Sequence, residues 1–113
     1  MIVDDEPLIA MLLQEWLEEL GHVPVGPAAS VSQALALLEA ETVRAAIVDV
    51  SLRQEDAYPV VHVLQQRNVP FAFGTGRGEQ AIEARYAGAP VLTKPYDFNA
   101  LKSVVAALLE SAA

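Results

Sequence analysis

The chain has 113 residues, of which 53% are hydrophobic and 19% are charged, with a formal net charge of −8 and no cysteine. This composition predicts one globular domain rather than a disordered chain, and the lack of cysteine excludes disulfides and zinc–thiolate sites. The excess of acids argues against nucleic-acid binding, which depends on clustered Lys and Arg. Because no signal peptide is recognisable and no apolar run approaches the roughly 20 residues of a membrane span, we expect a cytoplasmic protein without membrane contact.

The apolar pattern changes period repeatedly along the chain and predicts alternating strands and helices. Pro7 suits the first turn of a helix, and Gly21 ends that helix. Pro24 restricts its strand to an edge of the sheet, whereas Ser30 and Asp97 are suitable N-cap residues. In chain order, the predicted elements are a strand at 1–3, a helix at 7–20, an edge strand within 22–29, a helix at 31–41, a strand at 45–50, a helix at 55–67, a strand at 69–76, a short helix at 78–86, a strand at 89–95 and a final helix after Asp97.

Five repeats of strand then helix, with no linker between them, define the expected fold. Such alternation predicts a parallel sheet that is covered by helices on both faces. Right-handed crossovers then favour a doubly wound arrangement. The fold class is therefore α/β, a (βα)5 doubly wound parallel sheet forming one domain over 1–113. In sheets of this kind, ligands bind beyond the carboxyl ends of the strands.

Polar residues stand at those carboxyl ends. They are Asp4, Asp5, Asp49, Thr75 and Lys94. Three carboxylates close together cannot all stay ionised without a counter-charge, and hard oxygen ligands without Cys or His favour Mg²⁺. Asp4 and Asp5 are the better metal ligands, whereas Asp49, a lone acid after a very apolar strand, is the better nucleophile for forming an acyl phosphate. Lys94 supplies a point charge for a phosphate oxygen, and the Thr75 hydroxyl can donate a hydrogen bond to another.

The chain resembles the receiver domain of two-component response regulators in four segments. These are "IVDDEP" (2–7), "AAIVDVSL" (45–52), "PFAFGTG" (70–76) and "VLTKP" (91–95), which occur in the family's order across nearly the whole chain. The resemblance implies a flavodoxin/CheY-like (βα)5 fold with the strand order 2-1-3-4-5.

The same resemblance implies a role for each polar residue. A sensor histidine kinase or a histidine phosphotransfer protein would phosphorylate Asp49, and Thr75 and Lys94 would bind the phosphoryl oxygens. The ligands of Mg²⁺ would be Asp5 and Asp49 directly, Asp4 through water, and the backbone carbonyl of Ser51. The chain would then be a signalling switch that acts through protein contacts, with no enzyme activity beyond its own phosphorylation and dephosphorylation chemistry.

Some positions differ from the usual receiver pattern. Val91 stands where many receivers carry an aromatic switch residue, so the usual coupling between threonine and aromatic ring is impossible; Tyr86 and Tyr96 are candidate substitutes. The segment 70–78 is similar to the FAT GUY subgroup of alphaproteobacterial receivers, with Gly74 in place of the usual alanine. Membership of this subgroup implies a short fourth helix and a different output surface.

Two rival functions fit parts of the pattern. A Mg²⁺-dependent phosphatase with an aspartyl nucleophile would want a second acid two residues after Asp49, but residue 51 is Ser. A phosphorylation-independent protein-interaction module with a receiver fold would tolerate the altered loop after Asp49. The apolar stripe of the last helix is a candidate partner face, and a homodimer is compatible with it.

Overall fold

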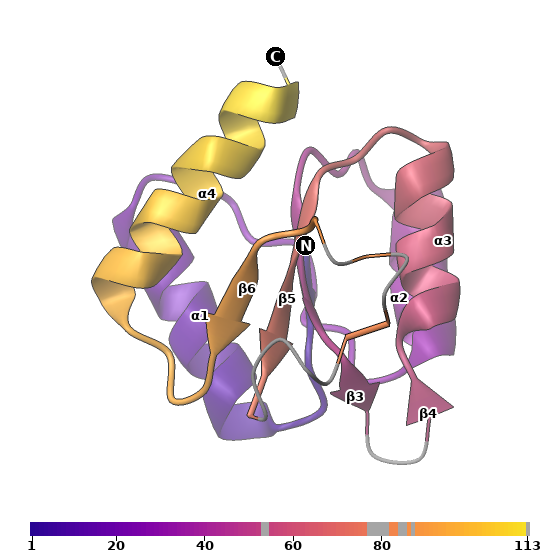
Figure 1. The fold of residues 1–113 in the computed structure, drawn as a ribbon, viewed down its shortest axis with the longest axis horizontal. Helices are drawn as coiled ribbons and strands as arrows, with labels where there is room; N and C mark the ends of the chain where they lie inside the picture. Colours follow the sequence, from indigo (N-terminus) through magenta and orange to yellow (C-terminus); the bar gives the residue numbers. More distant parts are fainter. Residues whose placement is uncertain (53–54, 77–81, 84–85, 87, 113) are drawn as a thin grey trace.

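The computed structural model describes residues 1–52, 55–76, 82–83, 86 and 88–112. Within these ranges, helices cover both faces of a parallel sheet (Figure 1). The elements, in chain order, are β1 (Ile2–Val3), α1 (Pro7–Glu19), α2 (Val31–Ala40), β2 (Ala46–Asp49), β3 (Ser51–Leu52), β4 (Glu55–Asp56), α3 (Tyr58–Gln66), β5 (Phe71–Thr75), β6 (Val91–Thr93) and α4 (Phe98–Ala112).

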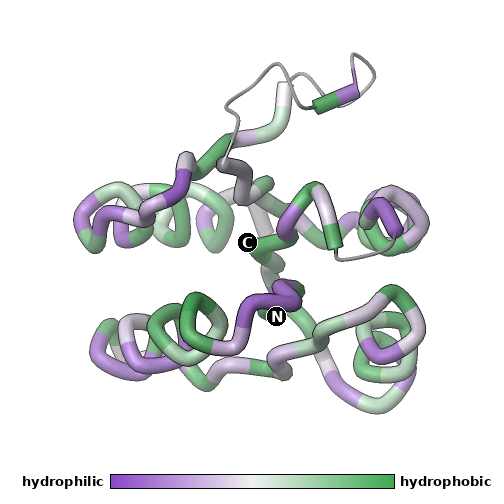
Figure 2. Tube along the Cα trace, turned by 90° about the horizontal axis from the view of Figure 1, so that it is seen from below, coloured by the Kyte–Doolittle hydropathy of each residue, from purple (hydrophilic) through white to green (hydrophobic). Residues whose placement is uncertain are grey.

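The main sheet has four parallel strands in the order β1-β2-β5-β6. β2 lies in its interior and is buried along its whole length, as a continuous apolar run in a parallel sheet predicts. Helices α1 and α4 cover one face and α2 and α3 cover the other; Figure 2 shows them on either side of the sheet. The predicted doubly wound α/β fold is confirmed.

Each face of the sheet has its own hydrophobic core. The α1/α4 core includes Ile2, Leu13, Ile47, Leu92, Tyr96 and Leu101. The α2/α3 core includes Val3, Val48, Val60, Leu64, Phe73 and Tyr86. Because successive side chains of a strand point to opposite faces, Ile47 enters the α1/α4 core and Val48 the α2/α3 core. The same alternation directs Asp49 toward the α1/α4 side.

The second predicted strand, within 22–29, does not form a regular strand. The segment runs beside β1, where Ala28 makes an isolated parallel bridge with Val3. The prediction of a strand is wrong because Pro24 and Pro27 have no N–H group to donate to a ladder of hydrogen bonds. The segment nevertheless takes the position beside the first strand that the order 2-1-3-4-5 assigns to it.

The helix predicted over 55–67 begins later, at Tyr58. Residues 55 and 56 instead form β4, which pairs antiparallel with β3. Pro59 explains the later start, because a proline in the first turn is tolerated but cannot supply the N–H that a helix beginning at residue 55 would need there. The Asp56 carboxylate also accepts a hydrogen bond from the Tyr58 N–H (3.1 Å) and so stabilises the observed start.

The two predicted N-caps are confirmed. Ser30 Oγ accepts a hydrogen bond from the Gln33 N–H (3.2 Å), and Asp97 Oδ2 accepts one from the Ala100 N–H (2.9 Å). The short helix predicted over 78–86 falls largely outside the described residues. In the described part of the chain, no helix is long and apolar enough to cross a membrane.

Candidate functional site

An acidic cluster lies at the carboxyl edge of the main sheet. Asp4 follows β1, Asp49 is the last residue of β2, and Lys94 follows β6. Since parallel strands all end at the same edge, residues that are far apart in the sequence meet there. The structure thus brings together the sequence-predicted residues Asp4, Asp5, Asp49 and Lys94.

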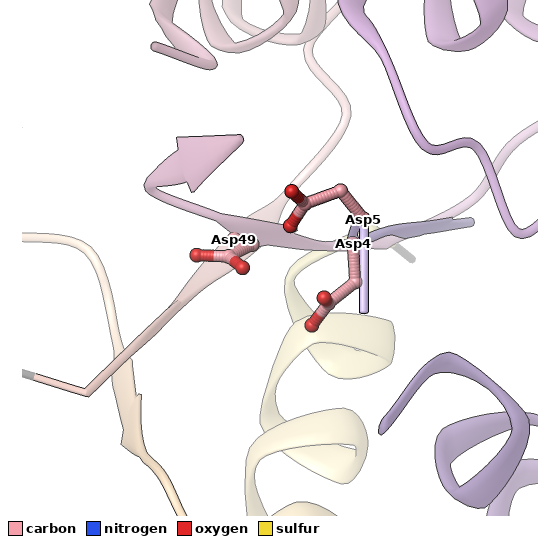
Figure 3. Close-up of side chains that lie close together, drawn as sticks. All are labelled: Asp4, Asp5 and Asp49. Carbon is pink, nitrogen blue, oxygen red and sulfur yellow. The ribbon is translucent and has the colours of Figure 1, made fainter. Parts of the chain in front are cut away.

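The three aspartates form a group that can hold a cation. One carboxylate oxygen from each of Asp4, Asp5 and Asp49 lies within 4.8 Å of the others (Figure 3). Asp4 and Asp49 are buried, and Asp5 is half-buried. Carboxylate oxygens are the hard ligands that Mg²⁺ takes, usually one or two of them directly together with waters, so the residues present fit the predicted magnesium site.

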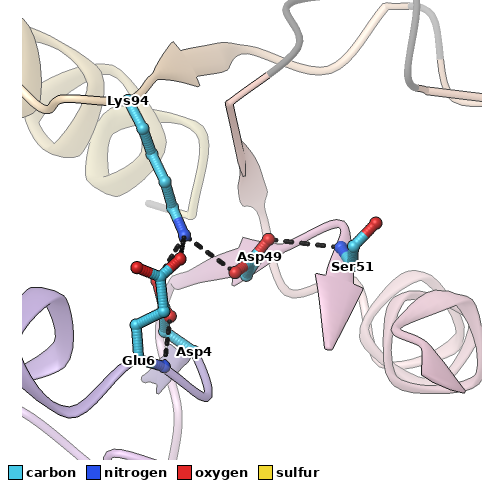
Figure 4. Close-up of polar contacts among 5 residues, drawn as sticks. All are labelled: Asp4, Glu6, Asp49, Ser51 and Lys94. Atoms are coloured by element: carbon cyan, nitrogen blue, oxygen red, sulfur yellow. Dashed lines mark hydrogen bonds and ion pairs between the residues drawn. The ribbon is translucent and has the colours of Figure 1, made fainter. Parts of the chain in front are cut away.

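Lys94 contacts three acids at this edge of the sheet. Its Nζ lies 2.8 Å from Glu6 Oε1, 2.9 Å from Asp49 Oδ2 and 3.3 Å from Asp4 Oδ2 (Figure 4). The contact with Asp4 is an ion pair without hydrogen-bond geometry, because Asp4 Oδ2 has no hydrogen-bond partner among the described residues. One lysine therefore balances part of the charge of three acids.

Burial and mutual repulsion alter the ionisation of these groups. Burial, together with the charge of Asp49, raises the pKa of Asp4 to about 6, against the opposing effects of the Glu6 N–H and of Lys94. Burial alone would lower the pKa of Lys94, but hydrogen bonds to Glu6 and Asp49 and the charges of Asp4 and Asp49 outweigh it and raise this pKa. The ionised form of Asp4 is thus disfavoured until a further positive charge joins the cluster.

Short turns orient the two buried carboxylates. Asp4 Oδ1 accepts a hydrogen bond from the Glu6 N–H (2.9 Å), and Asp49 Oδ1 accepts one from the Ser51 N–H (3.2 Å). Asp side chains commonly bond the backbone two residues later in this way. Each aspartate is therefore held through one oxygen, while its other oxygen faces Lys94.

The remaining predicted site residues lie near this edge of the sheet. Thr75 is the last residue of β5, is buried, and pairs in register with Thr93 of β6. Ser51 begins β3 directly after the acidic end of β2. The metal-ligand role of its carbonyl stays a prediction.

Glu6 is a member of the site that sequence reasoning missed. An acid at this place is typical of a charge that favours the start of a helix, and Glu6 does occupy the N-cap position of α1, without a side-chain capping bond. Its carboxylate instead binds Lys94, 88 residues away. The run of three acids, residues 4–6, was the signal in the sequence that could have pointed to Glu6. Its partner Lys94 could not be identified without knowing that β1 and β6 end at the same edge of the sheet.

The described residues thus form a doubly wound α/β domain with three carboxylates and a lysine at the carboxyl edge of its sheet. Residues 1–106 match the family model of the response regulator receiver domain, and the chain belongs to this family. It is accordingly a receiver domain of two-component signalling.

Known proteins of the family resemble the chain over nearly its whole length. Response regulator Rre1 of Synechocystis sp. is 30% identical over 116 aligned residues, covering 96% of this chain and 50% of that protein, so the chain spans about half the length of this curated relative. The solution structure of SdrG from Sphingomonas melonis Fr1 has a TM-score of 0.85 and 44% identity, covering 96% of this chain and 92% of that one. PhyR from Brucella abortus has a TM-score of 0.81 and 32% identity, with coverages of 97% and 46%.

Proposed function

We propose that the domain is a phosphorylation-dependent switch whose phosphoacceptor is Asp49. The observation that carries this proposal is the buried Asp49 carboxylate, which stands between two further aspartates and the Lys94 ammonium group at 2.9 Å. An acyl phosphate formed there would have a cation site and a lysine at hand to offset its charge. Membership of the receiver family supports the same role.

The proposed reaction is a transfer from phosphohistidine. One carboxylate oxygen of Asp49 attacks the phosphorus of a phosphohistidine on a sensor histidine kinase or a histidine phosphotransfer protein. The P–O bond forms as the P–N bond breaks, and the imidazole nitrogen keeps the electron pair. Hydrogen bonds from Ser51 N–H and Lys94 already orient the two oxygens of Asp49, which reduces the reorganisation that the attack requires.

Acidic residues of the chain would hold Mg²⁺ in this reaction. Asp5 and Asp49 would bind it directly, Asp4 through water, and Ser51 through its backbone carbonyl. The cation, when bound, supplies positive charge to the carboxylates and to the incoming phosphoryl oxygens. The pKa of Asp4, raised to about 6 by burial and by Asp49, supports this assignment because the cluster lacks positive charge.

Phosphorylation would redistribute the contacts of Lys94 and Thr75. The acyl phosphate carries roughly two negative charges where the Asp49 carboxylate carried one, and Lys94 would exchange its contact with the exposed Glu6 for a phosphoryl oxygen. The Thr75 hydroxyl would donate a hydrogen bond to another oxygen. Because Glu6 precedes α1 and Thr75 ends β5, both exchanges would bias the nearby surface between two arrangements and so act on a partner protein.

A phosphorylation-independent interaction module is the second candidate. One solved relative, PhyR from Bartonella quintana, is described as an anti-anti-sigma factor and is 28% identical with a TM-score of 0.84. Val91 in place of an aromatic residue also removes the usual switch residue. In this function the domain would bind its partner with the same affinity before and after phosphorylation.

Intact mass spectrometry after incubation with acetyl phosphate and Mg²⁺ tests the proposal. We expect the wild-type chain to gain the mass of one phosphoryl group and the Asp49→Asn variant to gain none. Asp56→Asn, which changes an exposed acid of β4 in the same way, is the matched control and should react like the wild type. Steady release of inorganic phosphate would instead indicate a phosphatase, and the absence of both reactions would leave the interaction module.

A further inference from the structure

Tyr96 places a buried hydroxyl beneath the acidic cluster. Its side chain is only 8% exposed, and its Oη has no hydrogen-bond partner among the described residues. A buried hydroxyl without a partner is rare in folded proteins and calls for an explanation. The ring packs in the α1/α4 core, two residues after Lys94.

Gly74 makes room for this hydroxyl. A Cβ atom added to Gly74 would lie 1.8 Å from Tyr96 Oη and 2.9 Å from its Cζ, far inside any real contact. Any other residue at position 74 would therefore push the Tyr96 hydroxyl away. Gly74 and Tyr96 therefore fit each other, because the Tyr96 hydroxyl occupies the space that a side chain at position 74 would fill.

The position of Gly74 shows on which face of the sheet the hydroxyl lies. Gly74 pairs in register with Asp49 on β2 and with Leu92 on β6. Leu92 belongs to the same α1/α4 core as Tyr96, and side-chain alternation directs Asp49 to that face as well. The hydroxyl thus lies between the apolar core and the acidic edge, where the charges of Lys94 and Asp4 act on it.

Asp4 Oδ2 is a complementary atom that also lacks a hydrogen bond among the described residues. This oxygen is buried, and Lys94 Nζ lies 3.3 Å away in an ion pair. A carboxylate oxygen is an acceptor and a tyrosine hydroxyl is a donor. Buried polar atoms that lack a direct partner are commonly joined by an ordered water with two or more such contacts.

We propose that Tyr96 is a positioning residue of the cation site, whose hydroxyl donates through one buried water to Asp4 Oδ2. The inference rests on the proposed function, in which Asp4 takes part in holding Mg²⁺. A water held by the Tyr96 hydroxyl would fix the Asp4 carboxylate from the side of the α1/α4 core and keep it in the orientation that binds the cation. Outer partners of metal ligands commonly change metal affinity by about 10- to 100-fold when they are removed, and because Asp4 would itself hold Mg²⁺ through water, we expect the effect of Tyr96 at the lower end of this range.

The test measures the affinity for Mg²⁺ alone, by amide NMR titration and calorimetry. We expect Tyr96→Phe to weaken Mg²⁺ binding about 10-fold while the ring keeps its packing. Gly74→Ala should weaken binding to a similar extent, because its methyl group takes the place of the hydroxyl. The double variant should bind Mg²⁺ no more weakly than Tyr96→Phe alone, since both changes remove one interaction.

Two controls separate this role from a general loss of packing. Tyr86→Phe removes the hydroxyl of a buried tyrosine in the α2/α3 core, and Gly76→Ala adds a methyl group that meets nothing within 4 Å. Both should bind Mg²⁺ like the wild type. Thermal unfolding of every variant shows whether Mg²⁺ affinity merely follows stability; affinity losses that track the unfolding temperature or add up in the double variant would overturn the proposal.

The outcomes also distinguish this inference from the proposed function. If the wild type binds Mg²⁺ and Tyr96→Phe binds it equally well, the role of Tyr96 is wrong and the phosphorylation switch stands. If the wild type does not bind Mg²⁺, both fail. A crystal structure provides a direct check: a water within hydrogen-bond distance of Tyr96 Oη and Asp4 Oδ2 supports the proposal, and a different partner for either atom contradicts it.

Discussion

The two faces of the sheet are packed in different ways. On the α2/α3 side, Phe73 is surrounded by aromatic rings, with centroids 5.4 Å from Phe71, 6.0 Å from Tyr86 and 6.3 Å from Tyr58. Tyr58 also stacks on Tyr86 at 5.3 Å. On the α1/α4 side, the buried core members among the described residues are aliphatic except for Tyr96. Four aromatic residues thus pack together on the α2/α3 face, whereas the buried part of the α1/α4 core has one described aromatic ring, that of Tyr96, whose hydroxyl points toward the site.

This difference separates residues that stabilise the fold from residues that position charge. The aromatic cluster buries large apolar rings and contributes favourably to the free energy of folding. The acidic edge opposes folding, because burial and the charge of Asp49 raise the pKa of Asp4 to about 6. Such a cost is expected where a site is arranged for a ligand that carries the missing charge.

Truncation of Phe73 should have the largest effect on stability. The side chain is fully buried at the centre of the aromatic cluster, so Phe73→Ala should lower the free energy of unfolding by about 4 kcal/mol. Urea denaturation measures this change. Phe98→Ala, on the half-buried ring that packs on Trp16 at 5.4 Å, is the control on the other side; an equal loss there would contradict the contrast between the faces.

The pH dependence of stability should reveal the cost of Asp4. Its folded-state pKa of about 6 lies above the ordinary value of 3.8, so the folded chain binds this proton more tightly than the unfolded chain. In Mg²⁺-free buffer, the free energy of unfolding should therefore fall as pH rises from about 4 to about 6. At about 1.4 kcal/mol per pKa unit, the loss is about 3 kcal/mol and persists above pH 6.

Asp4→Asn should abolish most of this pH dependence and make the chain more stable at pH 7. Asp56→Asn, at an exposed acid, should leave it unchanged. Thermal or urea unfolding at several pH values gives the comparison. A stability that falls equally between pH 4 and 6 in the wild type and in Asp4→Asn would show that Asp4 is not the group responsible for the fall.

Removal of the Lys94 ammonium group should have opposite effects on stability and on Mg²⁺ affinity. Lys94→Met leaves Asp4 and Asp49 without their positive partner, and the partly buried site should lose about 2 kcal/mol of stability in Mg²⁺-free buffer. Mg²⁺ should bind this variant more tightly, because Lys94 no longer competes for the same carboxylates. Calorimetric titration measures the affinity, with the exposed Lys102→Met as control; weaker binding of Mg²⁺ by Lys94→Met would refute the competition.

The sequence was sufficient for features that depend on local pattern. The apolar runs before Asp49 and Thr75 predicted buried strands, and side chains that cap helices, such as Ser30 and Asp97, were identified from their type and place. Because parallel strands end at one edge, the meeting of Asp4 and Asp49 followed from the fold class alone.

Features that depend on contacts between distant segments could not be predicted. Glu6 binds Lys94 only because β1 and β6 end at the same edge. The antiparallel pair of β3 and β4 consists of two-residue strands, which are too short to show a period. The contact between Gly74 and Tyr96 requires the register of β5 and the path of the chain after β6, and neither leaves a pattern in the sequence.

The smallest predicted effect compares two tyrosine hydroxyls on opposite faces. The Tyr58 hydroxyl accepts a hydrogen bond from the Glu83 N–H (2.8 Å), on the side of the aromatic cluster. Tyr58→Phe keeps the stacked ring and should lower the free energy of unfolding by about 1 kcal/mol, with no change in Mg²⁺ affinity. Tyr96→Phe should do the reverse, with weakened Mg²⁺ binding and little loss of stability, because its hydroxyl has no direct protein partner among the described residues. Urea unfolding and Mg²⁺ titration of both variants measure the free energy of unfolding and the Mg²⁺ affinity. If both variants respond alike, the two faces of the sheet do not differ in whether their tyrosine hydroxyls act on stability or on the cation site.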